Sequence, residues 1–218
     1  MKFPDELRSA LKAPLPGLEI QLQMMNDSMG KIRKEASLQM NEGAKKAAVF
    51  LLLYQKMDQW FTVLMQRPES PYAHSKQISF PGGRFEKQDT SLLDTALRET
   101  HEEFGISPSA IQPLGALSDL YIPVSNFWVQ PYVGYMDSEP QFQIDPIEVA
   151  SLIEVPLSQF LNSKTRTRKD IPTRQGLILK QMPCFVVDDK IIWGATAMIL
   201  HEFLHILQGK GLTDLVLS

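Results

Sequence analysis

The apolar positions of the chain predict a series of strands and helices beyond residue 46. Continuous apolar runs at residues 47–54 and 60–66 are typical of buried strands, and residues 57–59 between them predict a turn. A last helix is predicted at 195–207. Strands mixed with helices, and hairpins mixed with crossovers, predict an α/β protein with a mixed sheet covered on both faces. The other predicted elements are strands at 78–80, 111–120, 127–135, 149–155, 177–182 and 184–187, a candidate hairpin strand at 191–193, a short helix at 156–161 and a basic loop at 162–170.

Residues 1–46 carry a weaker pattern. It favours short helices at 4–11 and 32–39, and the stretch Ala13-Pro14-Leu15-Pro16-Gly17 ends the first of them. We therefore expect an N-terminal helical extension over residues 1–46, followed by one main domain over residues 47–218.

The segment from Leu93 to Gly105 predicts a helix with two separate faces. Core-facing residues recur at i, i+3, i+4, i+7 and i+11 from Leu93 onwards. We expect Ser91 or Asp89 to cap its start and Gly105 to end it. A second face carries three carboxylates, those of Glu99, Glu102 and Glu103. Such like charges repel by about 0.2–0.5 kcal/mol per pair, and Mg²⁺ or Mn²⁺ would neutralise them. The alternative from the residues alone is a solvated acidic face.

This segment resembles the Nudix box, G-x5-E-x7-R-E-U-x-E-E-x-G-U, in which U is aliphatic. Asp89 stands where the first glutamate belongs, Thr100 takes an aliphatic position, and one extra residue separates Asp89 from Arg98. These departures resemble the coenzyme A pyrophosphatase branch. The same branch carries a lead-in similar to His74-Ser75-Lys76-Gln77-Ile78-Ser79-Phe80-Pro81-Gly82-Gly83, with Lys76 here in place of a glycine. The residues that match the box are Gly83, Arg98, Glu99, Glu102, Glu103, Gly105 and Ile106.

The resemblance implies a Nudix-like α/β/α sandwich whose catalytic box is a loop–helix–loop. It implies Mg²⁺- or Mn²⁺-dependent hydrolysis of coenzyme A or acyl-coenzyme A to 3′,5′-ADP and (acyl) 4′-phosphopantetheine. Arg98 is expected to orient Glu102 or Asp89, and Glu148 is a candidate general base beside the box glutamates. The expected catalytic residues are Glu102, Glu103, Arg98 and Glu148; the expected metal ligands are Gly83, Glu99, Glu102 and Glu103; the expected substrate-binding residues are Arg67, Gln77 and Arg84.

Other functions stay open at this point. The box alone also fits a Nudix hydrolase of ADP-ribose, NADH, dinucleotides or oxidised nucleotides. A non-catalytic nucleotide-binding module is a further alternative, although the box carboxylates are all present. His201-Glu202-Phe203-Leu204-His205 matches the short His-Glu-x-x-His motif of zinc metalloproteases. Its simpler interpretation is an amphipathic final helix.

Composition narrows the choice of partners. The 218 residues carry a net charge of −3, so no basic excess argues for nucleic acid. The single cysteine, Cys184, excludes an intramolecular disulfide and a cysteine metal cluster. The N-terminal residues lack the apolar region of a signal peptide, and no apolar run is long enough to span a membrane. We therefore expect a cytoplasmic protein with a small nucleotide substrate; a homodimer is expected from the family resemblance alone.

Overall fold

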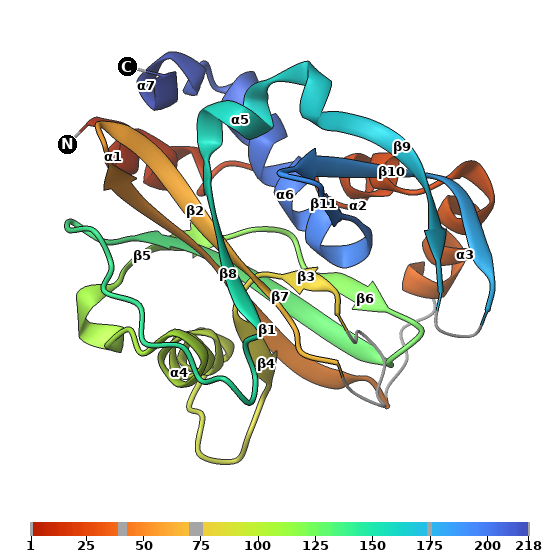
Figure 1. The fold of residues 1–218 in the computed structure, drawn as a ribbon, viewed down its shortest axis with the longest axis horizontal. Helices are drawn as coiled ribbons and strands as arrows, with labels where there is room; N and C mark the ends of the chain where they lie inside the picture. The colour runs from red at the N-terminus through yellow and green to blue at the C-terminus, as the bar shows by residue number, and fades with distance from the viewer. Residues whose placement is uncertain (1, 39–42, 70–75, 174–175, 218) are drawn as a thin grey trace.

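A mixed eight-stranded sheet forms the centre of the molecule, with helices on both of its faces (Figure 1). The computed structural model describes residues 2–38, 43–69, 76–173 and 176–217. Strand β1 (Lys45–Lys56) pairs with β7 (Phe127–Tyr135) in parallel. Its other edge is shared antiparallel by β2 (Gln59–Gln66) and β4 (Gly82–Arg84). The remaining strands are β3 (Ile78–Ser79) and β8 (Ser151–Pro156), which pair with β2, and β5 (Gln112–Ala116) and β6 (Leu120–Ile122), which pair with β7.

The side chains of β1 alternate between two buried layers. Phe50 and Leu52 pack in the cluster that includes α4 (Leu92–Phe104). Leu51 packs on the opposite face, in the cluster that includes α6 (Gly194–Gly209). A strand that is covered on both faces has a continuous run of apolar residues, which explains the apolar run at residues 47–54. The predicted α/β/α sandwich with a mixed sheet is confirmed.

Helix α4 begins and ends at the predicted caps. The Ser91 hydroxyl accepts a hydrogen bond from the Asp94 amide at 3.1 Å, which satisfies one of the free amides of the first turn. At the other end Gly105 has φ 71°, the left-handed conformation that a glycine adopts without steric cost. Ala96, Thr100 and Phe104 are buried against the sheet. Capping and packing thus fix which side of the helix carries its carboxylates.

The N-terminal helices pack onto the α6 side of the main sheet. Phe3 and Leu7 belong to the same buried cluster as Leu51 of β1. The carboxylate of Glu202 in α6 accepts hydrogen bonds from the Gly17 amide at 3.1 Å and from Nε2 of Gln21 at 2.9 Å. The division at residue 46 stays a prediction. The N-terminal elements are α1 (Lys2–Ala10), α2 (Leu18–Gln21), the 3₁₀ turn η1 (Leu22–Met24) and α3 (Asp27–Leu38).

The C-terminal third corrects part of the sequence prediction. The expected basic loop at 162–170 is wrong, because β9 (Arg166–Pro172) is the edge strand of a second, three-stranded sheet. Exposed basic side chains on an edge strand discourage pairing with another chain, and the same composition looks like a loop. The strands expected at 177–182 and 184–187 are one strand with an irregularity between Leu179 and Met182. The elements here are α5 (Leu157–Leu161), η3 (Ser163–Thr165), β10 (Ile178–Val187), β11 (Lys190–Ile192) and α7 (Thr213–Leu217).

Two smaller differences concern lengths. The strand expected at 111–120 is divided into β5 and β6, after the 3₁₀ turn η2 (Pro108–Ala110). The expected hairpin of 191–193 with the preceding strand is confirmed, since β11 pairs antiparallel with β10. Among the described residues, no helix has both the length and the apolar content needed to cross a membrane.

Candidate active site

The loop before α4 holds the buried carboxylate of Glu103. The Gly82 amide donates to Oε2 of Glu103 at 2.8 Å. Gly82 has φ 147°, and a Cβ atom there would lie 2.3 Å from the carbonyl oxygen of Ala48. Only glycine fits such a close approach of loop and strand. The tandem glycine therefore brings a main-chain donor to a carboxylate that is 1% exposed.

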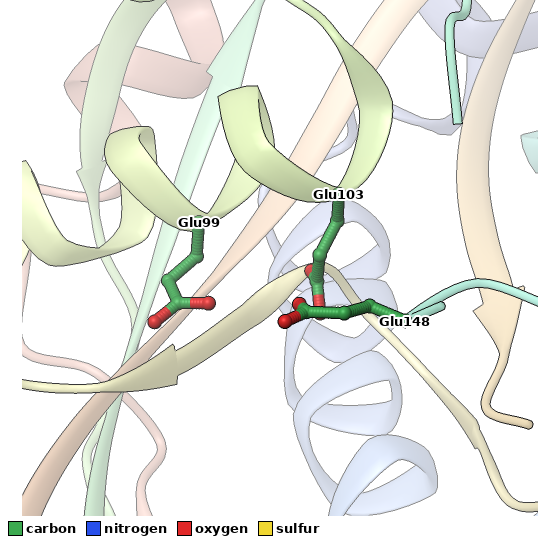
Figure 2. A group of neighbouring side chains, drawn as sticks. All are labelled: Glu99, Glu103 and Glu148. Atoms are coloured by element: carbon green, nitrogen blue, oxygen red, sulfur yellow. The ribbon is translucent and has the colours of Figure 1, made fainter. Parts of the chain in front are cut away.

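Glu99 lies one helical turn earlier, against Gly83. A Cβ atom at Gly83 would be 2.4 Å from Cδ of Glu99, so the missing side chain is what leaves room for this carboxylate. Oε1 of Glu99 also accepts a hydrogen bond from Nη1 of Arg98 at 3.0 Å. Glu99 and Glu103 thus face the glycine loop side by side (Figure 2).

Glu148 joins them from a distant loop. Carboxylate oxygens of Glu99, Glu103 and Glu148 all lie within 4.8 Å of one another (Figure 2). The loop is fixed to the end of α4, because the Asp145 amide donates to the Glu103 carbonyl at 3.2 Å. Asp145 in turn accepts from the Ile147 amide at 2.8 Å through its own carboxylate. This local turn places the exposed side chain of Glu148 beside the half-buried Glu99 and the buried Glu103.

The electrostatics of this group fit a divalent cation. Burial raises the pKa of Glu103 to about 8, and the charges of Glu99 and Glu148 add to the rise, while Arg67 and the Gly82 amide oppose it. Burial also raises the pKa of Glu99, against the opposing effect of Arg98. Clustered carboxylates are the hard oxygen ligands that Mg²⁺ and Mn²⁺ prefer, and a cation would stabilise all three in the charged form. The donor set therefore fits the metal that the sequence predicted.

Arg98 is the centre of a network behind these carboxylates. Its Nε donates to Oδ1 of Asp89 at 2.8 Å and its Nη2 to Oδ2 at 3.1 Å, a bidentate pair. Asp89 is buried and also accepts from the Thr95 hydroxyl and the Glu86 amide, both at 2.9 Å. The hydrogen bond from Arg98 is the main reason that the pKa of Asp89 falls to about 2. Asp89 is thus held in its charged form and anchors the guanidinium group.

Glu102 lies apart from the three-carboxylate group. Its carboxylate accepts from Nη1 of Arg98 at 2.8 Å, and its side chain is 49% exposed. It was predicted to be a metal ligand and a catalytic residue together with Glu103. The structure brings Glu102 to Arg98 and brings Glu148, expected only as a base, into the group with Glu99 and Glu103.

The predicted substrate-binding residues surround the glycine loop. Nη2 of Arg67 donates to the Gly82 carbonyl at 3.0 Å and lies 3.7 Å from Oε1 of Glu103. The Gln77 carbonyl accepts from the Arg67 amide at 3.0 Å, which ties the lead-in to β2. Arg84 has an exposed side chain, and its carbonyl accepts from Nη2 of Arg98 at 3.1 Å.

Lys76 takes the conformation that a glycine would favour. Its φ is 57°, in the left-handed region, and its amide donates to the Pro68 carbonyl at 3.3 Å. The resemblance placed a glycine at this position, so the loop geometry persists here at some conformational cost to lysine. His74 and Ser75 of the predicted lead-in lie outside the described residues.

The His-Glu-x-x-His sequence in α6 has structural partners in the described part of the chain. Glu202 is fully buried and binds the N-terminal segment at Gly17 and Gln21. Nε2 of His201 lies 3.1 Å from Oε1 of Gln23, and His205 is exposed. Within the described ranges, the only group of three or more potential metal-binding side chains is that of Glu99, Glu103 and Glu148. These contacts favour the simpler interpretation of the motif, a structural final helix.

Some features of the site carried no recognisable sequence signal. The Gly82 amide and the Asp145 turn were not predicted to position carboxylates. The tandem glycine was visible, but its partner Glu103 lies 21 residues away and the contact depends on the packing of α4. The contact between residue 145 and the end of α4 is likewise set by the fold and not by a local pattern.

Comparison with known proteins found several similar chains. The crystal structure of RenU, a Nudix hydrolase from M. smegmatis, is similar with a TM-score of 0.49 and 12% identity, covering 79% of this chain and 88% of that one. The uncharacterized Nudix hydrolase NudL of Pectobacterium atrosepticum is 35% identical over 140 residues, which cover 64% of this chain and 71% of that protein. The protein of the same name from Yersinia enterocolitica is 36% identical over 140 residues, covering 64% and 70%.

The NUDIX domain family matches residues 44–175, more than half of the chain. This span contains the glycine loop, α4 and Glu148. The chain therefore belongs to the Nudix hydrolase family. Its activity is hydrolysis of a pyrophosphate linkage in a small nucleotide substrate.

Proposed function

We propose that this Nudix hydrolase cleaves the pyrophosphate linkage of coenzyme A or an acyl-coenzyme A, with Mg²⁺ or Mn²⁺ as cofactor. The products would be 3′,5′-ADP and 4′-phosphopantetheine or its acyl form. The observation that carries the metal-dependent hydrolysis is the group of three carboxylates, whose oxygens lie within 4.8 Å of one another. The choice of coenzyme A rests on the resemblance of residues 74–83 and of the Asp89–Arg98 spacing.

Glu99 and Glu103 would hold the cation, together with the Gly83 carbonyl and Glu148. When bound, the cation offsets the charge of the pyrophosphate and lowers the pKa of a coordinated water. The carboxylates of Glu99 and Glu103 on one helix provide a rigid half of the site, because α4 is capped at both ends and packed against the sheet. The loop of Glu148 provides the other half.

Glu148 is the proposed general base. It is the exposed member of the group, so a water can reach its free oxygen and transfer a proton to it. Glu103 suits this role less well, because one of its oxygens is committed to the Gly82 amide. In this proposal Glu148 binds the cation through one carboxylate oxygen and accepts the proton through the other, whereas Glu99 and Glu103 only bind the cation.

Arg98 is proposed to position the carboxylates and not to bind the substrate. Its guanidinium group holds Glu99 through Nη1 and is itself fixed by Asp89. In this proposal Glu102 acts through Arg98, and its carboxylate would reach the cation only by leaving that ion pair. Removal of such supporting contacts commonly costs about 10- to 100-fold in metal affinity or activity.

The cationic side chains near the loop are the proposed phosphate contacts. Arg67 lies between Glu103 and the Gly82 carbonyl with about a third of its side chain exposed, and Arg84 is exposed beside Gly83. Gln77 is proposed to bind the substrate from the lead-in strand. A homodimer and a cytoplasmic location stay predictions from the sequence.

The test is a substrate panel with products identified by mass. The purified chain is incubated with Mg²⁺ or Mn²⁺ and with coenzyme A, ADP-ribose, NADH or a diadenosine polyphosphate, and the Glu103→Gln variant serves as the matched control. We expect 3′,5′-ADP and 4′-phosphopantetheine from coenzyme A, with coenzyme A preferred and the variant inactive. Preference for another diphosphate would refute the coenzyme A assignment and leave the family activity in place.

A further inference from the structure

A cavity of about 370 Å³ lies on the face of the main sheet opposite the carboxylates. Its walls come from α5, η3, β9, β10 and α6, with one residue from η1. Helix α6 packs on the side of β1 that carries Leu51, whereas α4 packs on the side that carries Phe50 (Figure 1). The central sheet therefore separates this cavity from the candidate active site, and nothing in the proposed hydrolysis uses it.

The lining of the cavity is cationic on one side and apolar on the other. Arg166 and Arg168 contribute from β9, and no aspartate or glutamate is among the described residues that line it. The apolar side includes Phe160, Phe185 and Leu204, which are nearly fully buried. A volume of a few hundred Å³ with a few polar groups and an apolar floor is typical of small-molecule sites.

The two arginines are available for a ligand. The guanidinium group of Arg166 forms no hydrogen bond or ion pair with any described residue. Arg168 uses one nitrogen, Nη1, to donate to the Gln181 carbonyl at 3.0 Å. The carboxylate of β9, Asp170, accepts hydrogen bonds from Gln181 and lies outside the lining. Among the described residues, no acidic side chain forms an ion pair with these two arginines, so this wall of the cavity presents positive charge.

His201, the first histidine of the His-Glu-x-x-His sequence, faces this cavity. Its Nε2 donates to the amide oxygen of Gln23 at 3.1 Å. Burial, together with the charges of Arg166 and His205, lowers the pKa of His201 to about 4, so the imidazole is neutral at pH 7. The net charge of the lining therefore comes from the two arginines, which matches the charge of a phosphate monoester.

We propose that this cavity is a second ligand site, which binds a small organic phosphate monoester. The phosphate contacts the guanidinium groups of Arg166 and Arg168, and the organic part lies against the apolar floor. Guanidinium groups suit phosphate because their planar donors pair with two of its oxygens at once. The site is independent of the proposed coenzyme A hydrolysis, and neither proposal depends on the other.

Binding of phenyl phosphate by isothermal titration calorimetry tests the site. The full chain is titrated in EDTA, since a metal-free carboxylate group repels phosphate. We expect saturable binding at one site per chain, weakened about tenfold or more in Arg166→Gln/Arg168→Gln. The matched control is Lys164→Gln/Lys169→Gln, which removes the same charge from exposed side chains outside the lining and should change affinity less than about twofold. Glu103→Gln should bind like the wild type.

Four results would overturn the proposal. Absence of saturable binding to the wild type would show that the cavity binds no such ligand. Equal weakening in the lysine control would show that general surface charge causes the binding. Loss of binding in Glu103→Gln would show that phenyl phosphate binds at the active site. Inorganic phosphate should bind more weakly than phenyl phosphate, and equal affinities would exclude an organic ligand. Arg166→Gln alone removes no hydrogen bond or ion pair with a described residue, so this single variant tests the proposal if the double variant fails to fold.

Discussion

The Gly82 amide donates to Oε2 of Glu103 at 2.8 Å, and this contact joins the glycine loop to the helix that carries the carboxylates. Glu103 is the most buried member of its group, so its charge is the one most dependent on a metal.

Substitution of the carboxylates should affect turnover to different degrees. Glu103→Gln should lower kcat by about 1,000-fold or more, because it removes a buried ligand charge worth several kcal/mol in the transition state. Glu102→Gln should cost about 10- to 100-fold, since Glu102 acts through Arg98. Steady-state kinetics at saturating Mg²⁺ measure both, and circular dichroism checks the fold. An equal loss of kcat in the two variants would indicate that Glu102 is a metal ligand like Glu103.

Gly83→Ala should displace Glu99. The added Cβ would lie 2.4 Å from Cδ of Glu99, which real structures do not tolerate, so the carboxylate must move. We expect a loss of kcat of about 100-fold or more, with an increase in the Mg²⁺ concentration needed for half-maximal rate. Gly30→Ala is the matched control, because a Cβ there meets nothing within 4 Å. Unchanged activity in Gly83→Ala would show that catalysis does not depend on the position of the Glu99 carboxylate.

The stability of the metal-free protein should fall as pH rises through neutrality. The pKa of Glu103 is about 8 in the folded chain, above its ordinary value near 4.5, so the folded state holds a proton that the unfolded state has lost. The free energy of unfolding in EDTA should therefore decrease between pH 5 and pH 8, and Glu103→Gln should reduce that slope. Mg²⁺ should stabilise the wild type more at pH 8 than at pH 6. Urea unfolding measures these values, and an identical slope in the variant would contradict the account.

Acid should weaken the Asp89–Arg98 pair. The pKa of Asp89 is about 2, below its ordinary value of 3.8, so its contribution to stability is present above pH 4 and lost as pH falls toward 2. The contribution is on the order of 2 kcal/mol. Asp89→Asn should be less stable at pH 5 and should lose less stability between pH 4 and pH 2 than the wild type. Parallel acid-unfolding curves would show that the pair contributes nothing.

Glu202→Gln should loosen the N-terminal segment and spare catalysis. Its carboxylate accepts hydrogen bonds from Gly17 and Gln21. In the variant, the NH₂ group of the new amide would face one of these two donors. We expect a loss of about 1–3 kcal/mol in stability and faster proteolysis around residues 11–18, with hydrolysis retained. The exposed His205→Gln is the control and should change neither. Loss of a zinc-dependent peptidase activity in both variants would instead revive the protease hypothesis.

Local patterns were sufficient for the main sheet and for α4. The apolar run of β1 and the capped stripe of α4 are encoded by neighbouring residues, and the box spacing singled out the helix that carries Glu99 and Glu103. β9 was missed because charged side chains on an edge strand have the composition of a loop. The position of Glu148 could not be derived from local patterns, because it depends on the turn at Asp145. The Asp145 amide binds the carbonyl of Glu103 at the end of α4, 42 residues earlier in the chain.

The role of Glu202 shows the same limit at longer range. Its sequence context suggested a zinc motif, but its partner Gly17 lies 185 residues away and only the assembled fold brings them together. The cavity beside His201 is also built from several elements of the C-terminal half, and one of them, β9, has a sequence pattern that predicts a loop.

Manganese binding measured by electron paramagnetic resonance tests the central claim, that Glu99, Glu103 and Glu148 form the metal centre. Free Mn²⁺ is titrated against the wild type and against single Gln variants of these residues and of Glu102. We predict that each of the three variants weakens Mn²⁺ binding about tenfold or more, and that Glu102→Gln weakens it less than the others. Equal Mn²⁺ affinity in the wild type and in Glu103→Gln would contradict the account.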